Sequence, residues 1–141
     1  MMKWLNRLGV ALAQVLLVAQ FVPAGRSNPS ERNFPDAPVE VQALMRRSCN
    51  DCHSNETVWP WYARIAPASF LIARDVKAGR KKLNLSIWGS YDELRKTRKK
   101  REIAKEVGGG DMPPWYYVPL HPEAKLSAEE RELIVKWANQ S

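Results

Sequence analysis

The segment Cys49-Asn50-Asp51-Cys52-His53 decides how the rest of the chain is interpreted. It holds the only two cysteines of the sequence, two residues apart, and one of the two histidines follows them directly. Two thiols about one helical turn apart can reach both vinyl groups on one edge of a porphyrin and add to them as thioethers. The next imidazole then lies under the iron. The motif therefore predicts one covalently attached haem c, with Cys49 and Cys52 as attachment points and His53 as the proximal iron ligand.

Two other uses of a C-x-x-C pair fit the sequence less well. A structural zinc site normally has four ligands in two pairs, and only His53 and His121 remain to complete one here. A redox-active dithiol usually begins a helix, where the helix dipole lowers the pKa of the attacking thiol. The apolar spacing over residues 41–48 instead places both cysteines at the end of a helix. Zinc binding and dithiol chemistry are therefore the minor alternatives.

The composition is compatible with one compact domain and indicates what it would bind. The chain has 141 residues, of which 45% are hydrophobic, 26% are charged and six are tryptophan. Large rings supply much buried area, which suits a small domain built around a flat macrocycle. The net charge of +7 favours an acidic redox protein or an anionic membrane surface as partner. No nucleic-acid-binding motif accompanies this charge, so a nucleic-acid partner is not expected.

Residues 1–24 are predicted to be a targeting segment. Lys3 and Arg7 precede an apolar run over residues 8–24, which is typical of a signal peptide or an uncleaved signal anchor. We expect a single-pass anchor in the bacterial inner membrane, rather than cleavage to a soluble periplasmic protein. Positive charges before the run favour a cytoplasmic N-terminus and an exported domain. The polar residues 25–35 are expected to be a linker, and residues 36–141 the haem-binding domain.

Helix signals after the linker indicate an all-α domain. Four helices are expected, over residues 38–48, 67–79, 90–107 and 127–139. The last two begin with apparent capping boxes, in which Ser90 and Ser127 are each followed by a glutamate three residues on. Gly79 is expected to end the second helix, and residues 80–88 to form a loop. The C-terminal helix is amphipathic and suited to pack on the helix that precedes the cysteines.

The predicted helix over residues 90–107 carries a basic cluster. Its members are Arg95, Lys96, Arg98, Lys99, Lys100, Arg101 and Lys105. The helix has only a weak apolar face, so we expect it to lie at the periphery of the domain. The cluster is either an ordinary solvated surface or a docking site for an acidic redox partner or lipid headgroups.

Residues 111–117 (DMPPWYY) are the second stretch that indicates chemistry. Glycines before it and prolines within it favour an extended, rigid loop. A single methionine held in such a loop is hard to explain as core filler, and a thioether is a soft ligand that raises the haem potential. Met112 is therefore the expected distal iron ligand. His121 is the alternative distal ligand, and an open or water-bound iron is the third possibility.

Several short motifs resemble those of the bacterial haem-binding domain family of cytochrome c-like proteins. They are CHSNET at 52–57, WPWY at 59–62, LNLSIW at 83–88, MPP at 112–114 and HP at 121–122. The resemblance covers about residues 20–140. It implies an all-helical, cytochrome c-like domain around one covalent haem, often tethered to a membrane. It also implies a domain that occurs alone or fused to other cytochrome or peroxidase modules.

The expected function is one-electron transfer in the cell envelope, without catalytic residues. Trp59 and Trp61 follow His53 closely in the sequence and are expected to line or cover the haem pocket. Arg80 and Asn84 are candidate partners of the haem propionates, although either is also compatible with a surface position. The alternatives are a peroxidase-like haem enzyme or ligand binder with an open distal position, and a non-redox sensing or structural module. No second histidine is clearly placed for acid–base work on peroxide, which weakens the enzyme hypothesis.

Overall fold

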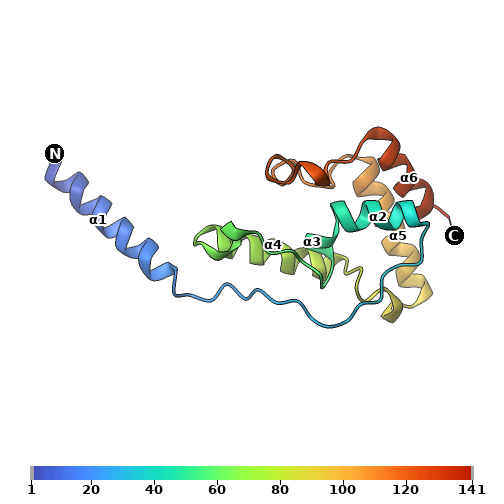
Figure 1. Cartoon of the computed structure of the whole chain (residues 1–141), viewed down its shortest axis with the longest axis horizontal. Coiled ribbons are helices and arrows are strands. Elements are labelled where there is room, and N and C mark those ends of the chain that lie inside the picture. The colour runs from blue at the N-terminus through green and yellow to red at the C-terminus, as the bar shows by residue number, and fades with distance from the viewer. Residues whose placement is uncertain (1, 141) are drawn as a thin grey trace.

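Helices make up the regular structure of the chain (Figure 1). The computed structural model describes residues 2–140. Met1, the first residue of the predicted targeting segment, and Ser141, the last residue of the predicted haem-binding domain, lie outside the described residues. The α-helices are α1 (Met2–Ala19), α2 (Val39–Ser48), α3 (Asn50–His53), α4 (Ala68–Lys82), α5 (Glu93–Gly108) and α6 (Ala128–Ala138). The short 3-10 helices are η1 (Trp61–Arg64), η2 (Trp88–Ser90), η3 (Val118–Leu120) and η4 (Pro122–Ala124). Within the described residues the one β contact is an isolated bridge, so the predicted all-α class is confirmed.

The main hydrophobic core lies where α2, α5 and α6 meet (Figure 1). Ile134 of α6 is fully buried there, and the rings of Trp88 and Trp137 lie 6.4 Å apart. At the edge of this core, Arg47 of α2 and Glu130 of α6 form an ion pair at 2.9 Å. The packing of α6 on α2 confirms the arrangement expected from the amphipathic C-terminal helix.

The helix α4 lies against α3 and is longer than the sequence indicates. The predicted end at Gly79 is wrong, because α4 continues to Lys82. Gly79 instead occupies the point of closest approach, where an added Cβ would overlap the carbonyl oxygen of Cys52. A residue without a side chain lets the two helices approach this closely. Gly79 therefore serves helix packing and not helix termination.

The helix α5 begins and packs differently from the prediction. Its N-cap is Asp92, whose carboxylate accepts a hydrogen bond at 2.7 Å from the backbone N–H three residues on. The capping box predicted at Ser90 is therefore wrong, whereas the one at Ser127 is confirmed. A peripheral position for α5 is also wrong, because Ile103 and Val107 are buried in the core. Two well-spaced apolar residues suffice to anchor a helix whose other faces are polar.

The helix α1 stands apart from the helices that follow it (Figure 1). Its residues 3–18 are exposed to solvent. The retained anchor expected over residues 1–24 is not supported, because no helix within residues 2–140 is long and apolar enough to cross a membrane. Lys3, Arg7 and Gln14 interrupt the apolar character of this 18-residue helix, and a span needs about 20 predominantly apolar residues.

The residues between α1 and α2 form an extended segment that runs along the domain (Figure 1). Residues 25–35 contain no helix, as expected for a linker. Asn33 nevertheless pairs with the segment after α4, since its N–H donates to the Ser86 carbonyl at 2.7 Å and its own carbonyl accepts from the Trp88 N–H at 3.1 Å. The linker is therefore attached to the domain along part of its length.

Candidate functional site

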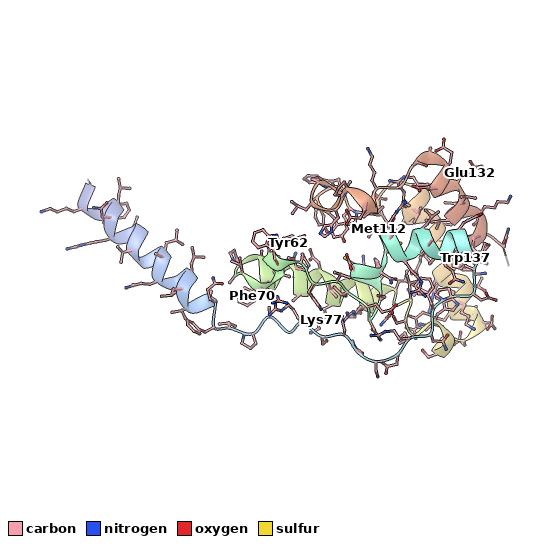
Figure 2. The ribbon with its side chains drawn as sticks, viewed as in Figure 1. Tyr62, Phe70, Lys77, Met112, Glu132 and Trp137 are labelled. Atoms are coloured by element: carbon pink, nitrogen blue, oxygen red, sulfur yellow. The ribbon has the colours of Figure 1, made fainter. Side chains whose placement is uncertain are left out.

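Both cysteines, His53 and Met112 line one small cavity. Cys49 lies at the junction of α2 and α3, whereas Cys52 and His53 lie within α3. Met112 comes from the loop after α5, which Figure 2 shows beside α2. The cavity has a volume of about 210 Å³ and all four residues line it. The structure thus brings together the residues that the sequence predicts to attach the haem and to bind its iron on both faces.

This cavity continues on both sides of the cysteines. Cys49, His53 and Met112 also line a cavity of about 350 Å³, whose apolar walls include Leu85 and Ile134. Cys52 lines a third cavity, of about 320 Å³. Neighbouring cavities share lining residues, so the three form one slot with the C-x-x-C-H segment along its middle. Apolar walls and a total space of this order suit a flat hydrophobic ligand.

His53 is held with one ring nitrogen against the protein backbone. Its Nδ1 lies 3.1 Å from the carbonyl oxygens of both Gly79 and Leu83. Because carbonyl oxygens only accept hydrogen bonds, Nδ1 carries the proton and Nε2 carries the lone pair. Burial lowers the pKa of His53, which keeps the ring neutral at neutral pH. A neutral imidazole with an anchored Nδ1 and a free Nε2 is the arrangement found in metal-binding histidines.

A buried polar network holds the segment after α4 next to His53. The Leu85 N–H donates to the His53 carbonyl at 2.7 Å. The Asn84 amide donates to the Asn55 side-chain oxygen at 2.8 Å, and its own oxygen accepts from the Ser86 N–H at 3.0 Å. Asn84 is buried among these partners and lines none of the three cavities. Its predicted contact with a propionate is therefore not supported, and it positions backbone instead.

Arg80 also lies outside the cavity walls. Its Nε donates to the Ser54 carbonyl at 2.6 Å, and its Nη1 donates to the Ser27 carbonyl at 2.8 Å. Its Nη2 donates to Asn28 Oδ1 at 3.0 Å and to Thr57 Oγ1 at 2.9 Å. The guanidinium thus ties the linker to the residues after the C-x-x-C-H motif. With these partners and no place in the cavity walls, Arg80 does not meet the expectation of a propionate contact.

The two tryptophans after the motif do not form the cavity walls. Trp61 is 74% exposed, and neither Trp59 nor Trp61 lines any of the three cavities. Tyr62 lines the 320 Å³ cavity instead, and Figure 2 shows it on the side of α4 turned toward the loop after α5. The physical reason is the tight turn of η1, which directs adjacent side chains to different sides.

A polar cluster that sequence reasoning missed lies beside Cys52. Asp51, between the cysteines, accepts hydrogen bonds from the Tyr117 hydroxyl at 2.6 Å and from the Val58 N–H at 2.9 Å. The Tyr117 ring stacks on His121 with centroids 4.0 Å apart. His121 Nε2 in turn is hydrogen-bonded to the Tyr62 hydroxyl at 2.6 Å. Because 66 positions separate Asp51 from Tyr117, no local sequence signal reveals this contact.

His121 is placed less favourably than Met112 to bind the iron. It lines the 320 Å³ cavity but not the two cavities that contain His53. The Nε2 of His121 is already hydrogen-bonded to the Tyr62 hydroxyl, so binding a metal there would break that bond. The other ring nitrogen, Nδ1, lies 3.3 Å from a carboxylate oxygen of Glu123. The geometry favours Met112 over His121 as distal ligand.

The loop that carries Met112 is held against the end of α5. Gly110 has a φ of +84°, a left-handed conformation that glycine adopts without strain. The Met112 N–H donates to the Glu106 carbonyl at 3.1 Å. Nη1 of Arg131, from α6, donates to the carbonyls of Met112 at 2.9 Å and Val107 at 3.0 Å. Arg131 therefore clamps the methionine loop to the C-terminal end of α5.

Both cysteines are half-buried, and their thiols are protonated at neutral pH. Burial, followed by the charge of Cys52, raises the pKa of Cys49 to about 12. Burial, followed by the charges of Asp51 and Asp75, raises the pKa of Cys52 to about 11. Redox-active and metal-binding thiols have lowered pKa values, so dithiol chemistry is disfavoured. Within residues 2–140 no group of three or more His, Cys, Asp or Glu residues is placed to hold a metal ion, which leaves a zinc site unsupported.

Comparison with known proteins indicates the family of this chain. A family model described as a haem-binding domain matches residues 14–140, which confirms the predicted family. A curated relative, cytochrome c peroxidase Ccp of Escherichia coli (strain K12), is 31% identical over 97 residues. The match covers 67% of this chain and 21% of the peroxidase, so the chain spans about a fifth of the length of that relative. No solved structure matches the chain.

Proposed function

Because this chain belongs to the haem-binding domain family, we propose that it is a small c-type cytochrome that carries one covalent haem and transfers single electrons. The observation that carries the proposal is the cavity lined by Cys49, Cys52, His53 and Met112 together. When bound there, a haem supplies one-electron chemistry by alternating between its ferric and ferrous states. The helical fold around the slot is compatible with a cytochrome c-like domain.

Cys49 and Cys52 are proposed to attach the haem covalently. Neither forms a disulfide, so both S–H groups are available. Each S–H would add across one vinyl double bond, with a new sulfur–carbon bond and the hydrogen placed on the other vinyl carbon. The addition is balanced without an external oxidant or reductant. The placement of both thiols in the wall of one cavity supports this use.

His53 and Met112 are proposed as the two axial ligands. His53 offers the free lone pair of Nε2, since its Nδ1 is engaged by backbone carbonyls. Met112 offers its thioether sulfur from the loop after α5. A methionine opposite a histidine stabilises ferrous iron and raises the midpoint potential. A protein that fills both axial positions leaves no position for a substrate, which suits electron transfer.

Peroxidase-like chemistry is the second candidate function, and the similarity to a cytochrome c peroxidase is the observation that favours it. Reaction with peroxide requires an open axial position and an acid–base group near it. His121 is the second histidine of the chain, but Tyr62 already engages its Nε2. The similarity also extends to only 21% of that enzyme. These observations support electron transfer more strongly.

The partner is proposed to be an acidic redox protein. Arg98, Arg101 and Lys105 of α5 are exposed, and the net charge of the chain is +7. Attraction between opposite charges speeds association and weakens as salt is added. We expect the rate of electron exchange with an acidic partner to fall with ionic strength, and a rate indifferent to salt would remove this proposal. Because Lys3 and Arg7 precede an apolar run, we also propose that the domain is exported.

The function is tested by loading the full chain with haem in a host that matures c-type cytochromes. We expect a low-spin visible spectrum after reduction, and haem that stays with the polypeptide on a denaturing gel stained for haem. The double variant Cys49→Ser with Cys52→Ser should lose the stained band. Haem that leaves the unmodified chain on the gel would contradict covalent attachment. A high-spin spectrum with rapid cyanide binding would contradict the axial pair and support the peroxidase-like function.

A further inference from the structure

Two lysines line the largest cavity of the slot. Lys82, at the end of α4, and Lys99, in the middle of α5, belong to the walls of the 350 Å³ cavity. The side chain of Lys99 is only 12% exposed, whereas its neighbours Arg98 and Arg101 are exposed to solvent. Lys99 pairs with Glu102, whose own side chain is 48% exposed, so a mostly buried ammonium group in a largely apolar wall is matched by a carboxylate that lies at the surface.

A largely apolar slot binds a carboxylate more favourably where a cation can pair with it. The porphyrin of a haem carries two propionates on the side opposite its vinyl groups, so a haem bound here brings two carboxylates with it. Among the described residues, Lys82 and Lys99 are the only lysine or arginine side chains that line the three cavities. Arg80, the arginine that the sequence suggested for this task, lines none of them.

We propose that Lys99 and Lys82 bind the propionate carboxylates of the haem, an inference that rests on the proposed function. Lys99 supplies an ammonium group from the cavity wall, where a charge-assisted hydrogen bond is strong because little water competes. Lys82 is exposed and supplies a second ammonium group from the rim. This assignment also gives the buried Lys99 side chain a function that the other basic residues of α5 do not share.

The carboxylates already near the cavity are compatible with this role. Glu102 pairs with Lys99, but its side chain is 48% exposed and is free to turn into solvent when another carboxylate arrives. Glu106 lines the same cavity one turn further along α5. Lys82 forms no ion pair within the described residues. His53 is neutral, so the lysines are the cations that face the slot here.

The test uses the full-length, haem-loaded protein with Lys99→Met and Lys82→Met, singly and together. Methionine keeps much of the length of lysine and removes the charge. Lys105→Met is the matched control, because Lys105 lies on the same helix, is exposed and lines none of the cavities. Cells are fed δ-aminolaevulinic acid labelled with ¹³C at the carboxyl carbon, which labels the haem only in its propionate carboxyls. Redox difference infrared spectra then report these groups alone.

We expect the labelled carboxylate band to shift in each lysine variant and to stay in place in Lys105→Met. In a plot of midpoint potential against pH, the slope changes at the pKa of a propionate. This pKa should rise by about one unit in each lysine variant, since losing a nearby cation raises the pKa of a carboxyl group. An unshifted band and an unchanged pH profile in the double variant would overturn the proposal.

A variant that fails to take up haem is also informative. If Lys99→Met does not load, Lys99→Arg should restore loading because it restores the charge, and a failure of arginine to do so would overturn the proposal. Failure of the proposed function is distinguishable from both results. In that case the unmodified protein itself would carry no covalent haem or would not be reversibly reduced.

Discussion

The two sides of the slot are built in different ways. On the His53 side, two backbone carbonyls hold the imidazole, and a buried network through Asn84 locks the segment behind it. On the Met112 side, one loop carries the sulfur, and bonds from Arg131 and to Glu106 hold the backbone of that loop. One proposed ligand is therefore part of the packed fold, and the other lies on a loop attached to it. We therefore expect substitutions on the His53 side to reduce haem binding, and substitutions on the Met112 side to change the ligation and midpoint potential of a haem that stays bound.

Removing His53 should have the largest effect. His53→Ala deletes the group that the helix pair α3 and α4 holds toward the slot, and we expect haem bound per chain to fall at least about tenfold. The ratio of haem to protein, measured as the pyridine haemochrome, checks this. His121→Ala is the control, because His121 lies outside the cavities that contain His53. Equal haem content in the two variants would show that His53 has no special role.

Removing Met112 should keep the haem and change its ligation. In Met112→Ala both attachment cysteines and His53 are intact, so the haem stays bound. Loss of the soft sulfur ligand should lower the midpoint potential and let cyanide bind rapidly. A redox titration and the ferric spectrum measure both effects. An unchanged low-spin spectrum would transfer the distal role to another residue, and His121 would be the first to test.

A methyl group at Gly79 should disturb the packing behind His53. In Gly79→Ala the added Cβ overlaps the Cys52 carbonyl oxygen, so α4 has to move away from α3. We expect the free energy of unfolding to fall by about 2 kcal/mol, as for other overpacked sites, measured by urea denaturation. Gly9→Ala is the matched control, since beyond the neighbouring backbone of its own helix no atom lies within 4 Å of its added Cβ. Equal stability of the two variants would rule out a tight contact between α3 and α4.

Releasing the clamp on the methionine loop should have the smallest effect. Arg131→Met removes hydrogen bonds to the carbonyls of Val107 and Met112, and we expect a loss of about 1 kcal/mol. If this loss of about 1 kcal/mol falls on the state in which the loop holds Met112 in the cavity, the open state becomes about five times more populated. Cyanide should then bind the ferric protein about fivefold faster. Arg98→Met, which changes an exposed residue of α5, should leave the rate unchanged. A rate as slow as in the unmodified protein would show that Arg131 does not control access to the iron.

The sequence predicted the parts of the site that depend on short-range spacing. Cys49, Cys52 and His53 lie within about one helical turn, so their shared chemistry is visible without a fold. The capping box at Ser127 is equally local, and it is present in the structure. Ser90 offered the same local pattern, but Asp92 lies closer to the helix and competes for the cap. The difference between Ser127 and Ser90 shows that a capping pattern in the sequence predicts the helix start only where no neighbouring residue makes a better cap.

Contacts between distant segments were not predictable in this way. Gly79 looks like a helix end in sequence, yet it lies inside α4 because α3 crosses there. Arg80 and Asn84 have the chemistry expected of propionate partners, but the linker and the segment after the motif engage them instead. Lys99 looks like one of many basic residues of α5 and is distinguished only by its burial. Residue type alone carries no information about which neighbour a side chain meets.

The sequence by itself determined the helical class and the family, and it led to the residues proposed to hold a haem, because each follows from residue types at short spacing. The tertiary structure decided which nitrogen of His53 is free, that Met112 and not His121 shares its cavity, and which lysines face the slot. Those outcomes depend on how α3, α4 and α5 pack. Packing follows from the fit of whole surfaces, which is a property of the folded chain and not of any short stretch.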